Sequence, residues 1–229
     1  MHEMAGELSS WEQIKAWRAA RRKELIALRL SRDADARKQL DREMVERLAS
    51  LIDVAGSPVL GIYFPIRGEI DLRELARRHV AAGGQVALPV VVEKGQPVEF
   101  WQWEPGARTR RGLWNIPIPR ERIVVHPQTL IVPLVGFDRS CFRLGYGAGY
   151  YDRTLAAAVS RPRAIGIAHS DAELPHDPSA ASRHPDGNDR DRELHPRVRT
   201  RPLRPPATLR SGRARHRWMA QARARANDE

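Results

Sequence analysis

The first quarter of the chain carries apolar residues at helical spacing. Residues 9–52 are rich in Ala, Leu, Arg, Lys and Glu and contain no Gly or Pro. Apolar side chains recur there at steps of three and four residues, as one buried helix face requires: Leu40, Met44, Leu48 and Leu51. Ser31 or Asp33 can cap a helix within a short polar bend, so the pattern predicts two helices.

After Pro58 the pattern changes to short, continuous apolar runs separated by helical stretches. Such runs are typical of strands that are buried on both faces of a sheet. The sequence predicts strands over 59–64, 86–92, 98–103, 129–135 and 164–168, and helices over 71–82 and 150–159. This alternation predicts a three-layer α/β fold, in which helices flank a mainly parallel sheet and further helices precede it.

Composition narrows the class of protein. Of 229 residues, 41% are hydrophobic, which is enough for a core. The single cysteine excludes a disulfide scaffold and a multi-cysteine zinc site. No apolar run approaches the roughly 18 residues needed to cross a bilayer. We therefore expect a cytoplasmic protein that has no membrane partner.

Positive charge is concentrated in the last quarter of the chain. Of the formal net charge of +11, residues 1–174 contribute +5 and residues 175–229 contribute +6. The last 55 residues also hold seven of the 17 prolines and no Ile, Phe or Tyr. Such a segment buries too little apolar surface to offset its ordering entropy. We expect a domain over 1–174 and a disordered basic tail over 175–229, where only 211–227 has the pattern of a short helix.

The run 143–152 carries the clearest chemistry. Gly145, Gly147 and Gly149 alternate, which lets the backbone approach a ligand closely. The helix predicted directly after them aims free N–H groups at the same place. Arg143 adds a forked donor for phosphate oxygens, and Asp152 is a carboxylate of the kind that holds Mg²⁺ against phosphates. The run predicts a phosphate-binding loop, although a glycine-rich turn with aromatic packing is the alternative.

The same run resembles the signature of the 5-formyltetrahydrofolate cyclo-ligases, also called methenyltetrahydrofolate synthetases. Phe137-Asp138 and a spacer precede Arg-Leu-Gly-x-Gly-x-Gly-Tyr-Tyr-Asp, as in that family. Three upstream blocks resemble further family motifs: Glu69-Ile70-Asp71, Trp114-Asn115-Ile116-Pro117 and Ile131-Val132-Pro133. The opening helix is similar to the family's start at Arg18, Arg22 and Glu24-Leu25, with Arg18 in place of the usual Lys. The similarity runs from about residue 15 to residue 174.

The resemblance implies an ATP-dependent reaction. Family members use ATP and Mg²⁺ to convert 5-formyltetrahydrofolate into 5,10-methenyltetrahydrofolate, with release of ADP and phosphate. It implies ATP contacts from these residues: Arg18, Arg22, Arg143, Leu144, Gly145, Tyr146, Gly147, Ala148, Gly149, Tyr150 and Tyr151. It implies folate contacts from these: Phe64, Glu69, Trp114, Tyr146, Gly147, Ala148, Gly149 and Tyr150. Asp152 is the implied magnesium ligand.

Each implied role has a structural alternative. Arg18 and Arg22 have the pattern of solvated helix charges, and Phe64 and Trp114 are large enough to be core residues. An acid such as Glu69 or Asp152 also stabilises the N-terminus of a following helix without binding anything.

The tail departs from the family pattern at Pro175. Residues 176–193 can be back-translated with synonymous codons so that reading one nucleotide later encodes MTHPQPHDIPMAMIVTE. This shifted sequence is similar to the segment that family members have at this place. We infer a shift of reading frame near Pro175, so that the tail is an out-of-frame translation. A chain that exists as written lacks the family's terminal strand and second magnesium-side Asp, so we expect weak ATP binding and little turnover from it.

Two other functions remain open from the sequence. The basic tail allows a nucleic-acid-binding protein, whose binding would be salt-sensitive and lost without residues 176–229. A paralogue that binds ATP or a folate but acts on another substrate would keep the same loop. We favour the cyclo-ligase, acting as a monomer on small molecules, because no nucleic-acid motif is present.

Overall fold

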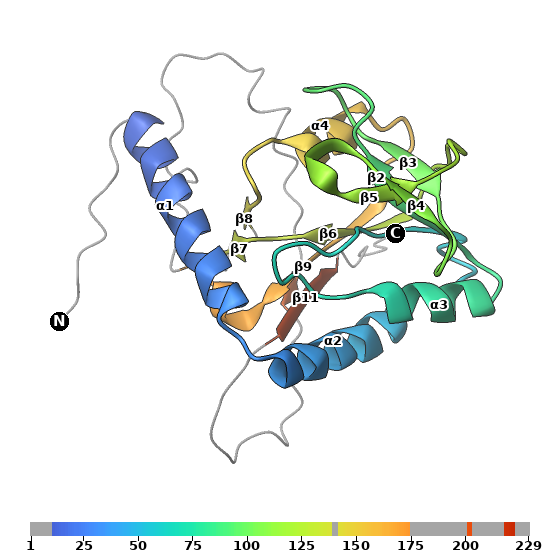
Figure 1. The fold of residues 1–229 in the computed structure, drawn as a ribbon, viewed down its shortest axis with the longest axis horizontal. Helices are drawn as coiled ribbons and strands as arrows, with labels where there is room; N and C mark the ends of the chain where they lie inside the picture. Colours follow the sequence, from blue (N-terminus) through green and yellow to red (C-terminus); the bar gives the residue numbers. More distant parts are fainter. Residues whose placement is uncertain (1–10, 139–141, 175–200, 203–217, 223–229) are drawn as a thin grey trace, which may run out of the picture.

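The computed structural model describes residues 11–138, 142–174, 201–202 and 218–222 (Figure 1). Its helices are α1 (Trp11–Leu30), α2 (Ala34–Ala49), α3 (Arg73–Ala81) and α4 (Tyr150–Ala157), with short 3₁₀ turns at Leu113–Asn115 and Ser170–Ala172. Its strands are β1 (Val59–Gly61), β2 (Gln85–Val90), β3 (Glu99–Gln102), β4 (Thr109–Arg111), β5 (Pro117–Pro119), β6 (Thr129–Pro133), β7 (Gly136–Phe137), β8 (Arg143–Leu144), β9 (Arg163–His169), β10 (Arg201–Pro202) and β11 (Trp218–Ala222).

The main sheet has the strand order β10-β11-β9-β6-β1-β2-β3. Its centre is parallel, since β9, β6, β1 and β2 pair in that sense. The flanking strands β3 and β11 run antiparallel to their neighbours. The predicted mainly parallel sheet is therefore confirmed.

Side-chain alternation along the strands sorts the core into two layers. In β6, Ile131 faces a cluster with α2 and α3, whereas Leu130 and Val132 face a cluster with Leu25 of α1 and Leu155 of α4. Figure 1 shows α2 and α3 below the sheet, α4 above it, and α1 at its left end. This is the expected three-layer α/β arrangement.

The N-terminal helices divide where the polar bend predicts. Asp33 precedes α2 in extended conformation, and its carboxylate accepts a hydrogen bond from the Ala36 N–H at 2.7 Å. This side-chain bond satisfies one of the free donors at the start of a helix. The buried residues of α2 are Leu40, Met44, Val45 and Leu48, which confirms most of the predicted face.

Strand β1 is shorter than the predicted 59–64, and its last residue explains the close packing there. A Cβ on Gly61 would lie 2.3 Å from Cδ2 of Leu130, so only glycine lets β6 pack this close. Beyond it the chain leaves the sheet and turns, with Arg67 and Gly68 at φ of 47° and 73°. Glu69 follows this turn directly.

Two small hairpins, β4–β5 and β7–β8, are not predicted by the sequence pattern. Their strands are two or three residues long, which is too short for a periodicity to appear.

Most of the tail lies outside the described residues, so the prediction that it is disordered concerns residues that the structure does not describe. Within it, Trp218–Ala222 is a strand that pairs antiparallel with β9, rather than part of the helix expected over 211–227. In the described ranges, no helix combines the length and apolar character needed to cross a membrane.

Candidate active site

The glycine-rich loop connects the β7–β8 hairpin to α4. Gly147 and Gly149 have φ of 98° and 67°, which side-chain-bearing residues rarely adopt. Gly149 immediately precedes α4, and the first N–H groups of a helix have no partner within it. The loop therefore has the backbone shape and the helix terminus that suit an anion.

Arg22 reaches this loop from α1, 123 residues earlier in the chain. Its Nε donates to the carbonyl oxygen of Gly145 at 2.8 Å. A Cβ on Gly147 would lie 3.3 Å from the guanidinium carbon, so the missing side chain makes room for the cation. The structure thus joins two predicted site residues that the sequence could only name separately.

Arg18 lies one turn earlier on α1 and is half-buried. Its guanidinium carbon is 5.8 Å from the centre of the Trp11 ring. Arg18 and Arg22 thus both avoid the fully solvated face of the helix.

Arg143 and Asp152 form an ion pair across the loop, and both side chains are half-buried. In the described part of the chain, no group of three or more His, Cys, Asp or Glu side chains is placed to hold a metal. A single carboxylate fits Mg²⁺ only as one ligand among phosphate oxygens and water, which is how this ion usually binds beside nucleotides.

Glu69 and Tyr146 meet on the other side of the loop. The Tyr146 hydroxyl donates to Oε1 of Glu69 at 2.8 Å, and the Ile66 N–H donates to Oε2 at 2.9 Å. Burial raises the pKa of Glu69 above its usual 4.5, against the lowering effect of these two bonds and of the cations Arg29 and Arg67. Burial and the nearby Glu69 also raise the pKa of Tyr146 strongly, so its phenol keeps its proton.

Two aromatic rings meet beside the start of α4. Trp114 and Tyr150 contact edge to face, with ring centres 5.6 Å apart. Trp114 is 60% exposed and has a φ of 55°, so it is not a core residue. An exposed ring held in an unfavourable backbone conformation is a common feature of ligand-binding positions.

Phe64 lies apart from these pairs. It is half-buried against the cluster formed with α2 and α3, and the Arg73 guanidinium carbon is 6.0 Å from its ring centre. Its packing agrees with the core alternative, and no described contact joins it to Glu69.

Two arginines near the loop are absent from the sequence-based set. The Arg153 guanidinium donates to the Ala148 carbonyl at 2.6 Å and lies 4.9 Å from the Tyr150 ring centre. Arg29 is buried at the end of α1, with 4% of its surface exposed. The available signal for Arg29 is its spacing of seven residues from Arg22, which places both on one helix face.

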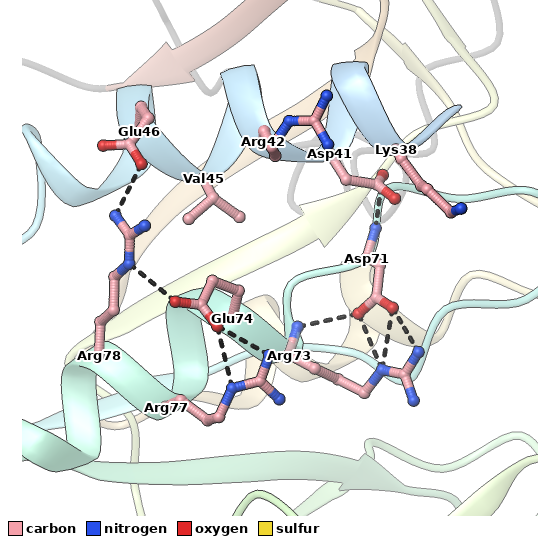
Figure 2. A pocket seen from close by; sticks show the side chains of 10 residues that line it. All are labelled: Lys38, Asp41, Arg42, Val45, Glu46, Asp71, Arg73, Glu74, Arg77 and Arg78. Carbon is pink, nitrogen blue, oxygen red and sulfur yellow. Dashed lines mark hydrogen bonds and ion pairs between the residues drawn. The ribbon is translucent and has the colours of Figure 1, made fainter. Parts of the chain in front are cut away.

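A separate groove between α2 and α3 does not belong to this site (Figure 2). Its charged side chains largely pair with each other, as Arg73 does with Asp71 and Arg78 with both Glu46 and Glu74. None of its lining residues lies in the glycine-rich loop. Figure 2 shows the ion pair between Arg78 and Glu46, which links α3 to α2 and is a structural contact.

Comparison with known proteins decides the family. The family model of the 5-formyltetrahydrofolate cyclo-ligases matches residues 14–183, about three quarters of the chain. The chain belongs to the 5-formyltetrahydrofolate cyclo-ligase family. The resemblance drawn from the glycine-rich run is thereby confirmed, and with it the assignment as an ATP-dependent ligase.

Two relatives that carry this family's name are matched over most of their own length. The 5-formyltetrahydrofolate cyclo-ligase of Mycolicibacterium smegmatis is 29% identical over 156 residues, which are 63% of this chain and 79% of that protein. The Escherichia coli cyclo-ligase is 26% identical over 142 residues, 59% of this chain and 78% of its own.

Two solved structures share the fold. The Aquifex aeolicus 5,10-methenyltetrahydrofolate synthetase matches with a TM-score of 0.59 and 29% identity, over 69% of this chain and 82% of its own. The Mycoplasma pneumoniae synthetase has a TM-score of 0.54 at 21% identity, over 69% and 89% of the two chains, and supports the fold alone.

Proposed function

We propose that this cyclo-ligase closes 5-formyltetrahydrofolate to 5,10-methenyltetrahydrofolate at the cost of ATP, with the glycine-rich loop between the two substrates. One observation carries the proposal. Gly145 accepts from the cation Arg22, and the next residue, Tyr146, donates to the buried carboxylate Glu69. Neighbouring residues of one loop thus contact a cation that suits phosphates and a buried carboxylate that suits the donor edge of a pterin.

The ATP side consists of the loop backbone, the start of α4 and the arginines around them. Arg22 and Arg143 supply forked donors that match phosphate oxygens in shape and charge. Loop residues from Leu144 to Tyr151 cradle the phosphates, and Arg18 extends the cationic face of α1. Asp152, which pairs with Arg143 in this structure, would be the residue that holds magnesium beside the phosphates.

The folate side is arranged around Glu69. A carboxylate accepts hydrogen bonds from the N–H groups on one edge of a pterin, and Tyr146 holds Glu69 in place from the loop. Trp114 and Tyr150 offer ring surfaces for the aromatic part of the folate. Phe64 lies three residues beyond β1 and packs partly against the α2–α3 cluster, so it would line the folate pocket only at its edge.

The reaction needs positioning more than acid–base chemistry. The formyl oxygen attacks the γ-phosphorus, and the bond from that phosphorus to the ADP oxygen breaks. The folate nitrogen N10 then attacks the formyl carbon, loses its proton to water, and the phosphorylated oxygen leaves as inorganic phosphate. Arginines and loop N–H groups align the phosphates and offset their growing charge. Bound magnesium would supply further neutralisation of phosphate charge.

Arg22 gives the sharpest test, because a matched control lies next to it. We expect Arg22→Met to raise the KM for ATP roughly ten- to a hundredfold, the value of a hydrogen bond to a charged group, with little change in folate affinity. Arg21→Met removes the same side chain from the same helix, where Arg21 pairs with exposed Glu24. It should leave the KM for ATP unchanged.

The readout is the near-ultraviolet absorbance of the methenyl product, with ATP and 5-formyltetrahydrofolate as substrates. Calorimetric binding of both substrates is measured in parallel, because the tail of this chain is expected to slow turnover. A folded protein that binds neither substrate and forms no product contradicts the proposal. Equal effects of the Arg22 and Arg21 substitutions would remove Arg22 from the site.

A further inference from the structure

Arg29 is a buried cation with an unused donor. Its exposed fraction is 4%, and its Nη2 atom is buried without a hydrogen-bond partner among the described residues. A buried polar group without a partner costs free energy, and a buried charge costs more. Proteins keep such groups where a bound molecule completes them.

The side chain lies against the turn that carries Glu69. A Cβ on Gly68 would sit 3.2 Å from Cγ of Arg29, so the absence of a side chain at Gly68 lets the arginine pass. Glu69 follows directly and is 8% exposed. The Arg29 charge lowers the pKa values of both Glu69 and Tyr146, which places the guanidinium near that pair.

Helix geometry places Arg29 at one end of the site and Arg22 at the other. The two residues are seven positions apart, which is two turns and about 10 Å along the axis. Between them, Leu25 fixes this face of α1 by packing with Phe137 and Leu144 of the β7–β8 hairpin. One helix face thus presents a cation to the glycine-rich loop and a second cation to Glu69.

The neighbouring Arg32, unlike Arg29, has partners for its guanidinium group. It forms an ion pair with Asp171, and its Nη1 donates to Nδ1 of His169 at 2.8 Å. Burial and Arg32 lower the pKa of His169 to about 4, so the imidazole is neutral and able to accept. Arg32 therefore uses the nearby acceptors at this end of α1, and Arg29 keeps its donor.

We propose that Arg29 binds the pterin directly, by donating from its guanidinium to the carbonyl oxygen at position 4. This step rests on the proposed function, in which Glu69 accepts from the pterin edge. That edge carries an amino group, a ring N–H and a carbonyl in a row, so it offers two donors and then an acceptor. A carboxylate beside a guanidinium complements that order.

The test combines a substitution with a change in the ligand. Binding of 5-formyltetrahydrofolate is compared with binding of its 4-amino analogue, which replaces the acceptor at position 4 by a donor and leaves the neighbouring ring nitrogen without its hydrogen. We expect Arg29→Met to weaken binding of the natural ligand roughly ten- to a hundredfold, as loss of a hydrogen bond to a charged group does. Binding of the 4-amino analogue should change less than about threefold, within the range of a lost neutral contact.

Two further variants make the result specific. Arg29→Lys keeps the positive charge but has a shorter side chain. It should therefore weaken binding of the natural ligand less than Arg29→Met does. Arg21→Met should change neither ligand's affinity, because Arg21 pairs with Glu24 away from the pocket. Thermal unfolding checks that each variant is folded before its affinities are compared.

The outcomes separate this proposal from the proposed function. Equal weakening of both ligands, or no weakening of either, overturns the Arg29 contact while the cyclo-ligase function stands. If the unchanged protein binds no 5-formyltetrahydrofolate at all, the proposed function is overturned and the Arg29 contact with it.

Discussion

At the scale of single residues, the site consists of charges placed where water has little access. Glu69 is the clearest case, because burial opposes its ionisation while Tyr146, Ile66 and two arginines favour it. Its charge state is therefore set by neighbours from three different parts of the chain. A residue in this balance responds to small changes of pH or of its partners.

Glu69 yields a prediction on pH. Its pKa in the free protein lies above 4.5, and only the ionised carboxylate accepts two bonds from a pterin. Folate affinity should be highest above that pKa and should fall about tenfold per pH unit below it. Calorimetric titrations of 5-formyltetrahydrofolate from pH 7 down to pH 4.5 measure this, with ATP affinity as the internal control.

The matched variant is Glu69→Gln, which keeps the size of the side chain and removes its titration. Its folate affinity should be weaker at neutral pH and almost independent of pH. Stability should respond in the opposite sense: a carboxyl whose pKa is raised by folding costs stability as pH rises from 4.5 through the raised pKa. A pH profile that is the same for both proteins would contradict the role of Glu69.

At the scale of secondary-structure elements, α1 and the glycine-rich loop meet through the Arg22–Gly145 hydrogen bond, so the proposed site is built from both. The inward face of α1 carries Arg22 and Arg29 with Leu25 between them. Of these three residues, Leu25 alone belongs to the apolar core cluster. The loop in turn depends on glycine where Arg22 passes over it.

Gly147 provides the test of this pairing. We expect Gly147→Ala to raise the KM for ATP about tenfold or more, because the new Cβ would lie 3.3 Å from the Arg22 guanidinium carbon. The positive φ adds a stability loss of about 1 kcal/mol or more. Steady-state kinetics and thermal unfolding separate the two effects.

Gly106 is the control for backbone strain. Its φ of 95° is close to the 98° of Gly147, but a Cβ there meets nothing within 4 Å. Gly106→Ala should therefore lose similar stability and leave the KM for ATP unchanged. An equal rise of KM in both variants would show that strain alone, and not the approach of Arg22, is responsible.

At the scale of the whole molecule, the open question is the end of the sheet beyond β9. In the structure Trp218–Ala222 pairs with this edge. The shifted translation of residues 176–193 offers Met-Ile-Val-Thr-Glu instead, which is richer in β-branched residues and so a better strand former. The frame of the tail therefore bears on the stability of the sheet and on the completeness of the site.

Two proteins test the frame. One is the chain as written, and the other carries the shifted sequence from residue 176 onward. We expect the second to turn over 5-formyltetrahydrofolate at least tenfold faster and to unfold at a midpoint several degrees higher, as a few kcal/mol of added stability gives at this size. Sequencing the gene across codon 175 provides the independent check. Equal turnover and equal midpoints, with an unshifted gene, would sink the inference.

Much of the fold is predictable from local patterns. The division of the first helical segment at Asp33, the buried strands β2, β6 and β9, and the helix after the glycines all follow from side-chain periodicity and capping chemistry. The hairpins β4–β5 and β7–β8 do not, because strands of two or three residues show no period. The strand at Trp218–Ala222 is set by the open edge of β9, which no local pattern encodes.

By itself the sequence determined the family, the three-layer α/β class and the residue types of the proposed phosphate loop, since these depend on spacing along the chain. Only the tertiary structure decided which residues meet. It placed Arg22 on Gly145, Tyr146 on Glu69 and Trp114 on Tyr150, and it packed Phe64 against the α2–α3 core cluster. It also showed that Arg29 is buried with an unused donor. The physical reason is that burial and hydrogen-bond satisfaction depend on neighbours from distant segments, whose approach is fixed only when the sheet and helices pack.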